Sequence, residues 1–273
     1  MTRHARWCLA LAIALLPARA ALAQSIWTPL DHRITARGEW WHAHFKSDVG
    51  APSTGSAAMF FSVGFPVNEK VALTFELPYA RVSAQDPFFG KIDDNTVGNP
   101  YVGVQLGALN KPVSYVGELG ARVSSVSEGS FFAAIMGAFS EMDRAEAFAP
   151  KTATLAAAGN IVIRRTGSSS RLRLGVSEML ASGSGSENTT LLDYGAQTAV
   201  DLQQVRFGGA LTGRYQVNGS GSFGDKSTHA VTGMTSIALG DFRPSLAIRV
   251  PFDKDVRDVA PWTVALGVEW EIH

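Results

Sequence analysis

The sequence has a single cysteine in 273 residues and no excess of charge of either sign. One cysteine cannot form a disulfide framework within the chain. Lysine plus arginine equals aspartate plus glutamate at 24 each, so no basic field indicates nucleic-acid binding. Hydrophobic residues make up 46% of the chain, and this excludes an intrinsically disordered protein.

Long apolar runs are also missing, since no window after the N-terminus offers the 18 or so uninterrupted apolar residues of a spanning helix. At the N-terminus, basic residues precede a short apolar run at 7–16, and Ala-Leu-Ala occupies 21–23. This three-part pattern is typical of a secretory signal peptide. We therefore expect a signal peptide over 1–23 and a mature chain over 24–273, which contains no cysteine.

Apolar and polar residues alternate with a period of two along the mature chain, most clearly from Trp262 to Ile272. Such alternation predicts β-strands with two different faces. We count twelve such segments. Their approximate bounds are 33–46, 56–66, 70–83, 98–109, 112–125, 152–165, 170–181, 190–202, 205–218, 228–239, 242–252 and 259–272.

The connections between these segments alternate between long and short. This pattern predicts a single all-β domain, a twelve-stranded antiparallel transmembrane β-barrel with short periplasmic turns and long external loops. A soluble lipocalin-like barrel is the alternative, with its apolar face inside. Strands of 11 or more residues and aromatic residues at strand ends, such as Tyr79 and Trp270, favour the membrane barrel. We therefore expect a monomer in the outer membrane of a Gram-negative-type cell, with outer-membrane lipid and assembly machinery as partners.

Two short motifs carry a family resemblance. The stretch Val63-Gly64-Phe65-Pro66-Val67 leads through a short turn to Glu76-Leu77-Pro78-Tyr79, and Thr96-Val97-Gly98-Asn99-Pro100 follows a long loop. Over about residues 56–125 the chain resembles the family labelled MetA-pathway of phenol degradation. The resemblance implies an outer-membrane barrel linked to uptake of hydrophobic or aromatic compounds, and it carries no catalytic residues.

Motifs for catalysis or cofactor binding are absent, since the chain has no GxSxG, P-loop, HExxH or CxxC sequence. His42 and His44 share one strand face at a spacing that could chelate a metal, but no third ligand is evident. We interpret them as interfacial or interior histidines. Ser227 and His229 could belong to an outer-membrane lipid hydrolase, although the sequence indicates no acid to orient the histidine. We predict no enzyme, no cofactor and no metal.

The connection at 126–151 has a helical period instead of a strand period. We predict a helix near 130–146 with Ser130 as its N-cap and Pro150 closing the segment. The helix either seals the barrel rim or forms a mouth helix that offers an entrance site to apolar solutes. The residues of this possible mouth helix are Phe131, Phe132, Ile135, Met136 and Phe139.

The polar faces of the predicted strands carry charges of both signs. A two-residue turn at Gln203-Gln204 places Asp201 opposite Arg206 and Asp193 opposite Arg214. Another at Asn110-Lys111 would place Tyr101 opposite Gly120. The predicted lumen-lining residues are Glu76, Glu118, Arg122, Asp193, Asp201, Arg206, Arg214, Arg243 and Arg249, with Arg37, Glu39, Arg164, Arg171, Arg173, Glu269 and Glu271 as further candidates.

These charges predict how open the barrel is. The predicted interior residues comprise nine arginines and seven acids, so the two signs nearly balance. Twelve strands also lie between the filled barrels of about 8 strands and the open porins of 16–18. We expect a narrow or partly plugged lumen without strong ion selectivity, whose charges either line the path or only brace the wall. The leading function is passive transport of small, possibly hydrophobic or aromatic, molecules. The alternatives are a lipid-modifying enzyme and a structural barrel without transport.

Overall fold

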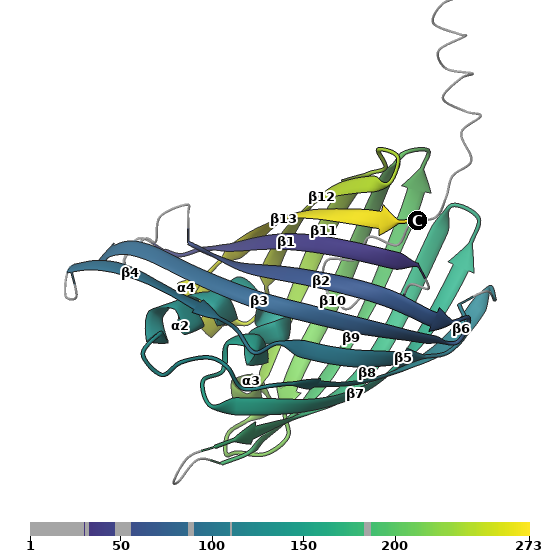
Figure 1. Ribbon diagram of the computed structural model, residues 1–273. Helices are drawn as coiled ribbons and strands as arrows, with labels where there is room; N and C mark the ends of the chain where they lie inside the picture. The colour runs from purple at the N-terminus through teal and green to yellow at the C-terminus, as the bar shows by residue number, and fades with distance from the viewer. Residues whose placement is uncertain (1–29, 31–32, 47–55, 87–89, 110, 183–186) are drawn as a thin grey trace, which may run out of the picture.

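A computed structural model describes residues 30, 33–46, 56–86, 90–109, 111–182 and 187–273. The predicted signal peptide, 1–23, lies outside the described residues. Thirteen strands form one antiparallel sheet, and the pairing of β2 with β3 closes twelve of them into a barrel (Figure 1). The predicted twelve-stranded antiparallel barrel is therefore confirmed, with one strand in addition.

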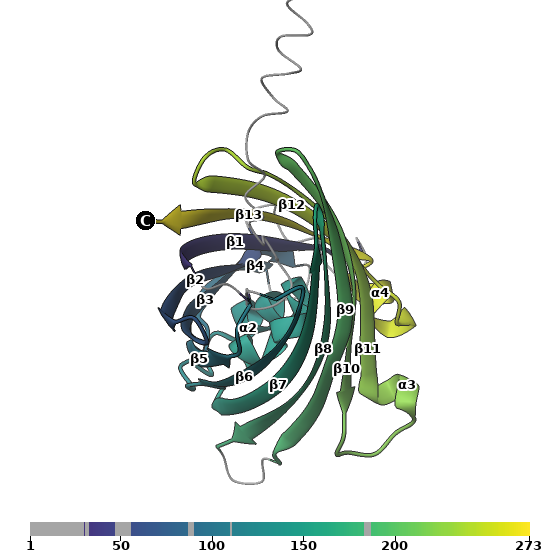
Figure 2. The ribbon, with the colours of Figure 1, turned by 90° about the vertical axis from the view of Figure 1, so that its right-hand side faces the viewer.

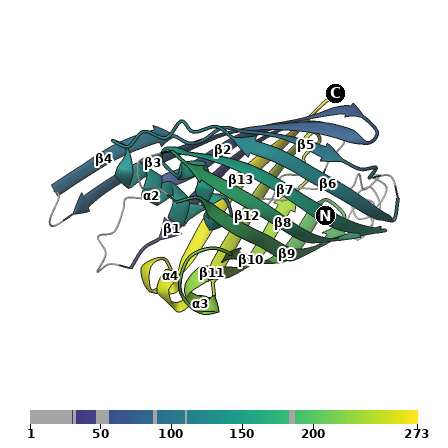
Figure 3. The ribbon, with the colours of Figure 1, turned by 90° about the horizontal axis from the view of Figure 1, so that it is seen from below.

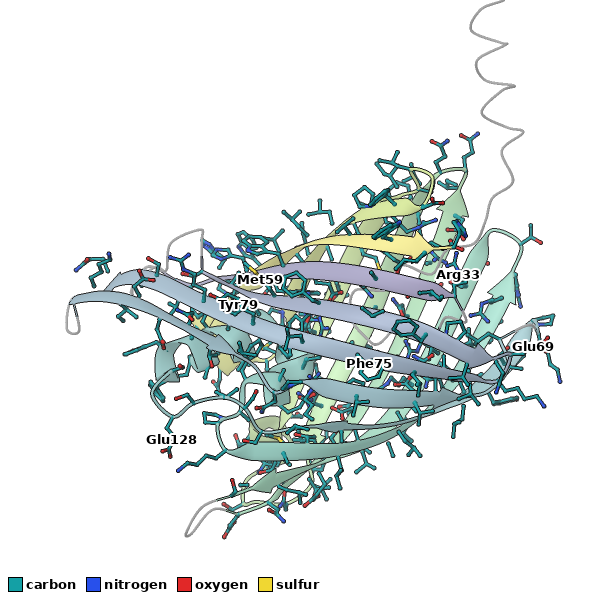
Figure 4. All side chains as sticks on the ribbon, viewed as in Figure 1. Arg33, Met59, Glu69, Phe75, Tyr79 and Glu128 are labelled. Atoms are coloured by element: carbon teal, nitrogen blue, oxygen red, sulfur yellow. The ribbon has the colours of Figure 1, made fainter. Side chains whose placement is uncertain are left out.

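The twelve wall strands follow one another around the barrel in chain order. Their bounds are β1 (Ile34–His44), β2 (Ala57–Asn68), β3 (Val71–Asp86), β5 (Tyr101–Leu106), β6 (Val113–Arg122), β7 (Thr152–Arg165), β8 (Ser168–Ala181), β9 (Thr189–Leu202), β10 (Val205–Gln216), β11 (Ser227–Ile237), β12 (Phe242–Pro251) and β13 (Trp262–Ile272). Short connections such as 203–204 gather at one end, which we call the turn end, and the long connections gather at the other, the loop end. Figure 4 marks the two ends with Glu69 and Glu128.

Large apolar side chains face outward, as expected of a barrel that lies in lipid. Phe75, Leu211 and Leu266 are 45%, 50% and 52% exposed, and Phe75 can be seen on β3 in Figure 4. The neighbouring strand positions are buried, for example Thr74 and Thr212. Because a soluble barrel would bury its apolar face, this alternation opposes the lipocalin-like alternative.

The thirteenth strand, β4 (Gly90–Val97), lies in a segment that the alternation predicted as part of a loop. Strand β3 is long enough to take two partners, pairing with β5 over its first half and with β4 over its second. The wall strand β5 therefore begins only at Tyr101, and residues 98–100 separate it from β4. The β3–β4 hairpin projects beyond the loop end (Figure 1).

The register of β5 with β6 differs from the prediction. Tyr101 pairs with Arg122 and not with Gly120, a shift of two residues, because the strands end at Leu106 and restart at Val113 around a longer connection. The Tyr101 ring nevertheless covers Gly120. A Cβ atom there would lie 2.2 Å from the Tyr101 hydroxyl, so only glycine fits.

Among the described residues, four short helices lie at the loop end: α2 (Phe131–Ser140), the 3-10 helix η2 (Met142–Phe148), α3 (Phe223–Lys226) and α4 (Lys254–Val259). Figure 3 labels the three α-helices. The single helix predicted for 130–146 is thus two helices, since Glu141 leaves the helical conformation and Arg144 has a φ of −130°. Ser130 makes no side-chain cap, and the Asp94 carboxylate instead accepts from the Ala133 amide at 3.0 Å. Among the described residues, no helix has the length and hydrophobicity needed to span a bilayer.

Candidate functional site

The segment Val126–Phe148, which we call the plug, folds back between the walls of the barrel (Figure 2). Its buried side chains Ala133, Met136 and Phe148 pack against inward-facing Trp41 and Phe60. The rings of Phe60 and Phe148 meet edge to face at 5.7 Å. This apolar cluster fills the loop end of the interior, and it is the only large apolar contact between the wall and the plug in the described residues.

The predicted mouth-helix residues divide between two environments. Met136 is buried at 4% exposure, and Phe132 packs partly against the apolar cluster. Phe139 is half-buried with its ring 6.0 Å from that of Phe45. Phe131 and Ile135 are 58% and 39% exposed. One face of α2 therefore seals the rim locally, while another remains accessible.

Arg144 anchors the plug at the centre of the barrel. Its guanidinium binds Glu76 at 2.6 Å, contacts Glu39 and lies 3.6 Å from a Glu141 oxygen. It also stands 3.6 Å above the Phe60 ring. Two wall strands, β1 and β3, are in this way tied to η2 by one cation, because the separate terminal nitrogens of the guanidinium donate to two different carboxylates.

Three acids of the plug bind arginines of three other wall strands, β12, β10 and β6. Glu141 and Asp143 bind Arg249 at 2.7 and 3.0 Å. Glu146 binds Arg214 at 2.9 Å and approaches Arg122 to 3.5 Å. Adding Arg144 and these three acids to the nine arginines and seven acids predicted from the strands gives ten of each sign. The plug therefore neutralises the arginine excess of the wall.

Asn99 bonds the backbone at both ends of the plug, next to the point where β4 leaves the barrel. Its side-chain amide donates to the carbonyls of Glu146, Ala149 and Thr152 at 2.8 to 3.2 Å, and its oxygen accepts from the amides of Ser125 and Val126. The residue has no exposed surface. One buried side chain thus satisfies five backbone groups that would otherwise lack partners at the break in the wall.

A cavity of about 60 Å³ remains between the plug and the wall. Tyr101, Arg122, Arg144, Arg173 and Asp193 are among its lining residues. A single water needs roughly 10–15 Å³ of such volume, so the cavity holds only a few. This cavity is consequently small, and most of its lining side chains are polar or charged.

Other predicted interior residues pair within the wall. Asp201 binds Arg206 at 3.2 Å and Asp193 binds Arg214 at 2.7 Å, in the register predicted from the turn at 203–204. Glu118 binds Arg171 at 2.6 Å.

Three more of the predicted interior residues also lie close to opposite charges. Glu76 binds Arg122 at 2.8 Å. Arg243 lies opposite Glu269 in the sheet and is 7% exposed. Arg249 is 1% exposed beneath the plug acids.

His42, His44 and His229 lie on the outer faces of their strands. His42 and His44 stack on Trp40 and Trp262 with ring centroids 5.5 and 4.6 Å apart, and the described residues contain no cluster of three metal-ligating side chains. His229 does have an orienting acid, contrary to the prediction, because Asp253 lies 3.2 Å from its Nδ1 atom.

The other nitrogen of His229 is also occupied. Its Nε2 atom bonds the Tyr194 hydroxyl at 2.6 Å, while no hydrogen bond joins it to Ser227 in the described part of the chain. The proposed Ser227–His229 pair is therefore not assembled.

Known structures share this architecture. The COG4313 outer membrane channel from Pseudomonas putida F1 aligns with 92% of this chain and 100% of its own at a TM-score of 0.60 and 11% identity. The NanC porin aligns at a TM-score of 0.58 and 8% identity, and the KdgM porin aligns at a TM-score of 0.54 and 10% identity. Each alignment covers 88% of this chain and 99% or more of the porin. The chain has the fold of outer-membrane channels. No family model and no curated protein matches its sequence.

Proposed function

We propose that the protein is an outer-membrane channel for passive diffusion of small solutes. The observation that carries this proposal is the interior of the closed barrel. It is lined by charges, and it is obstructed by a plug that is tied to the wall through ion pairs. We infer a size-limited channel from this combination of a charged interior with a separate inserted segment.

The outer face supports the location in the membrane. Apolar side chains such as Leu246, Ile248 and Val268 form an exposed surface, and the aromatic rings of Phe242 and Trp270 stack at the turn end. A substitution such as Leu266→Arg should cost about 2–4 kcal/mol in a bilayer near mid-strand. The signal peptide expected over 1–23 supports export to the same compartment.

The solute class rests on the sequence resemblance. The motifs around Pro66 and Leu77-Pro78-Tyr79 are similar to those of barrels linked to hydrophobic or aromatic compounds, so we propose small solutes of that kind. Liposome swelling with sugars and with aromatic acids, compared on the same protein, tests this choice. Growth of a deletion strain across carbon sources would then identify the compound.

Planar-bilayer recording of the purified protein tests the channel itself. We expect a small conductance without strong ion selectivity, since the plug fills the interior and the two signs balance. The triple variant Glu141→Gln, Asp143→Asn, Glu146→Gln should conduct more and favour anions, because it leaves the wall arginines uncompensated. Glu128→Gln is the matched control, since its partner Lys151 lies at the surface. A wild-type protein that neither conducts nor passes solutes would overturn the proposal.

An enzyme remains the competing function, and the Tyr194–His229–Asp253 chain at the loop end is the observation that favours it. Phospholipase and lipid A deacylase activity should be measured in the wild type and in His229→Ala. We expect no activity in either protein, since Ser227 does not reach the histidine. Activity that disappears in the variant would reverse the ranking.

A further inference from the structure

Two apolar side chains interrupt the polar inner face of the barrel near its turn end. Val116 of β6 and Val162 of β7 are 2% and 3% exposed. Each pairs across the two strands with a buried polar residue, Val116 with Asn160 and Val162 with Ser114. Because apolar surface is stabilised when it is removed from water, the two valines require an apolar neighbour inside the barrel.

Leu30 is that neighbour. It is 1% exposed and forms one apolar cluster with Val116 and Val162, against which Leu109 packs in part. We call these four residues the turn-end cluster. The Leu109 carbonyl accepts a hydrogen bond from Arg164 at 2.9 Å, and this bond holds the connection after β5 beside the cluster. A residue that precedes β1 is in this way packed against β6 and β7.

Arg33, three positions after Leu30, contacts a different part of the wall. Its guanidinium binds Glu271 of β13, and Figure 4 labels Arg33 at the turn end. Strands β13 and β7 are six strands apart in the ring of twelve, so they stand on opposite sides of the barrel. Two residues only three positions apart thus contact opposite walls, and Leu30 therefore lies within the bore.

Little room remains at this level of the barrel. A cavity of about 10 Å³ at the same end is lined by residues that include Thr35, Thr74 and Gln105. A single water needs roughly 10–15 Å³. Toward the plug, the turn-end cluster adjoins the buried ion pair of Glu118 and Arg171, since Val162 pairs with Arg171 in the sheet. A solute that has passed the plug meets Leu30 before it leaves the barrel.

We propose that Leu30, with Val116 and Val162, forms an apolar constriction that favours solutes with an apolar body over small hydrated ions. An ion that enters such a constriction loses water without gaining a hydrogen-bond partner, whereas an apolar body has no such cost. This inference rests on the proposed channel and names the side chains that set its preference for the solute class. The plug limits the size of the solute, and the turn-end cluster adds selection by polarity.

Disulfide cross-linking tests the position of Leu30 independently of transport. The chain after residue 23 contains no cysteine, so a cross-link comes only from an introduced pair. Oxidation of the double variant Leu30→Cys, Val162→Cys should shift most of the unfolded protein on non-reducing gels. The control is Leu30→Cys, Ser236→Cys, because Ser236 is also buried in the wall, on β11 opposite Arg206. Equal cross-linking of the two pairs would overturn the inference.

Planar-bilayer recording of the full-length barrel tests the selection by polarity. With potassium chloride on one side and potassium benzoate on the other, the reversal potential gives the permeability of benzoate relative to chloride. In Leu30→Gln this ratio should fall about threefold and the chloride conductance should rise, because a polar side chain of similar size admits hydrated ions. Leu239→Gln is the matched control, since Leu239 is 58% exposed at the same end, and it should change neither value.

Val116→Thr separates polarity from displacement of Leu30. Threonine has nearly the shape of valine, and oxidised Leu30→Cys, Val162→Cys fixes the position of residue 30. Adding Val116→Thr to this cross-linked protein should still lower the ratio of benzoate to chloride permeability, with heat-modifiable migration on gels confirming that the barrel has folded. An unchanged ratio in Leu30→Gln or in Val116→Thr would overturn the inference and leave the channel standing. Absence of conductance from the wild type and every variant would instead overturn the channel, and the selection with it.

Discussion

The walls from β7 to β10 and from β3 to β6 close the same barrel by different means. The first, which we call the regular wall, consists of four strands of 12 to 14 residues, each paired with its sequence neighbour along most of its length. In the second, which we call the broken wall, β3 has 16 residues but its wall partner β5 has six, and β4 departs from the barrel above Tyr101. The second wall is completed by the plug, which lies against the break.

The interior charges follow the same division. On the β7–β10 side, Asp201 and Arg206 pair across a single hairpin. On the β3–β6 side, Glu76 is bound by Arg144, which lies 68 residues further along the chain. The charges of the regular wall thus pair mainly across hairpins, with Arg214 also binding Glu146 of the plug, while Glu76 of the broken wall shares its ion pairs between Arg122 and Arg144 of the plug. This difference predicts that variants of the plug contacts affect conductance and stability together, and that variants of the regular wall affect stability alone.

The largest effect should come from Arg144→Met. The substitution leaves Glu39, Glu76 and Glu141 buried without their shared cation, at a cost of about 3–5 kcal/mol. Chemical unfolding in lipid vesicles measures this loss, and bilayer recordings should show a larger conductance that favours cations, since negative charge is now in excess.

Arg206→Met is the matched change in the regular wall. Its partner Asp201 keeps 15% of its side-chain surface exposed and can recover water, so we expect a smaller loss and an unchanged conductance. Equal conductance changes in the two variants would contradict the division between the walls.

Asn99→Ala should have the next largest effect. It leaves buried carbonyls and amides at the base of the plug without partners, which we expect to cost about 3 kcal/mol. Limited proteolysis should then cut within 126–148, and the conductance should rise.

Asn160→Ala separates loss of stability from release of the plug. Asn160 of β7 is also a buried asparagine, and it bonds Glu118 and the Val116 carbonyl of β6 and Arg171 of β8, none of which belongs to the plug. Its removal should lower stability without exposing the plug to protease. Cleavage at 126–148 in this variant as well would show that the plug is not held separately.

The sequence predicts the regular wall well because its information is local. Alternation places Asp193, Asp201 and Arg214 on one face, and a two-residue turn then fixes their pairing. The same reasoning fails by two residues for Tyr101, since the Gly107 amide bonds the Lys70 carbonyl and the connection extends beyond Asn110-Lys111. Turn length cannot be read where a backbone contact from another hairpin lengthens the loop.

The plug is the part of the candidate site that strand reasoning missed. Its helical period is visible, but Glu141, Asp143 and Glu146 lie outside any strand and were not counted among the interior charges. One signal could have found them, namely the excess of arginine among the predicted inward residues. Buried arginines require acids, and these are three of the four acids of the one loop that also carries an apolar helix.

A smaller difference concerns glycine in the two walls. Gly120→Ala would place a methyl group 2.2 Å from the Tyr101 hydroxyl, and displacing that packed ring should cost about 1–3 kcal/mol. Gly159→Ala in β7 meets no atom within 4 Å and should stabilise the barrel by roughly 0.5 kcal/mol, because it restricts the unfolded chain. Unfolding midpoints in urea compare the two variants. Equal midpoints would mean that Tyr101 does not rest on the glycine backbone.

The smallest expected effect tests the turn that sets the register of the regular wall. Gln203 has a φ of 58°, in the left-handed region where a side chain costs about 1 kcal/mol relative to glycine. Gln203→Gly should therefore raise the urea midpoint slightly, with conductance unchanged because the turn lies far from the plug. Gln204→Gly is the control, since Gln204 has no positive φ and glycine there only adds freedom to the unfolded chain. If Gln204→Gly stabilises as much as Gln203→Gly, the strain does not lie at Gln203, and the register of β9 with β10 is then fixed by the Asp201–Arg206 and Asp193–Arg214 pairs alone.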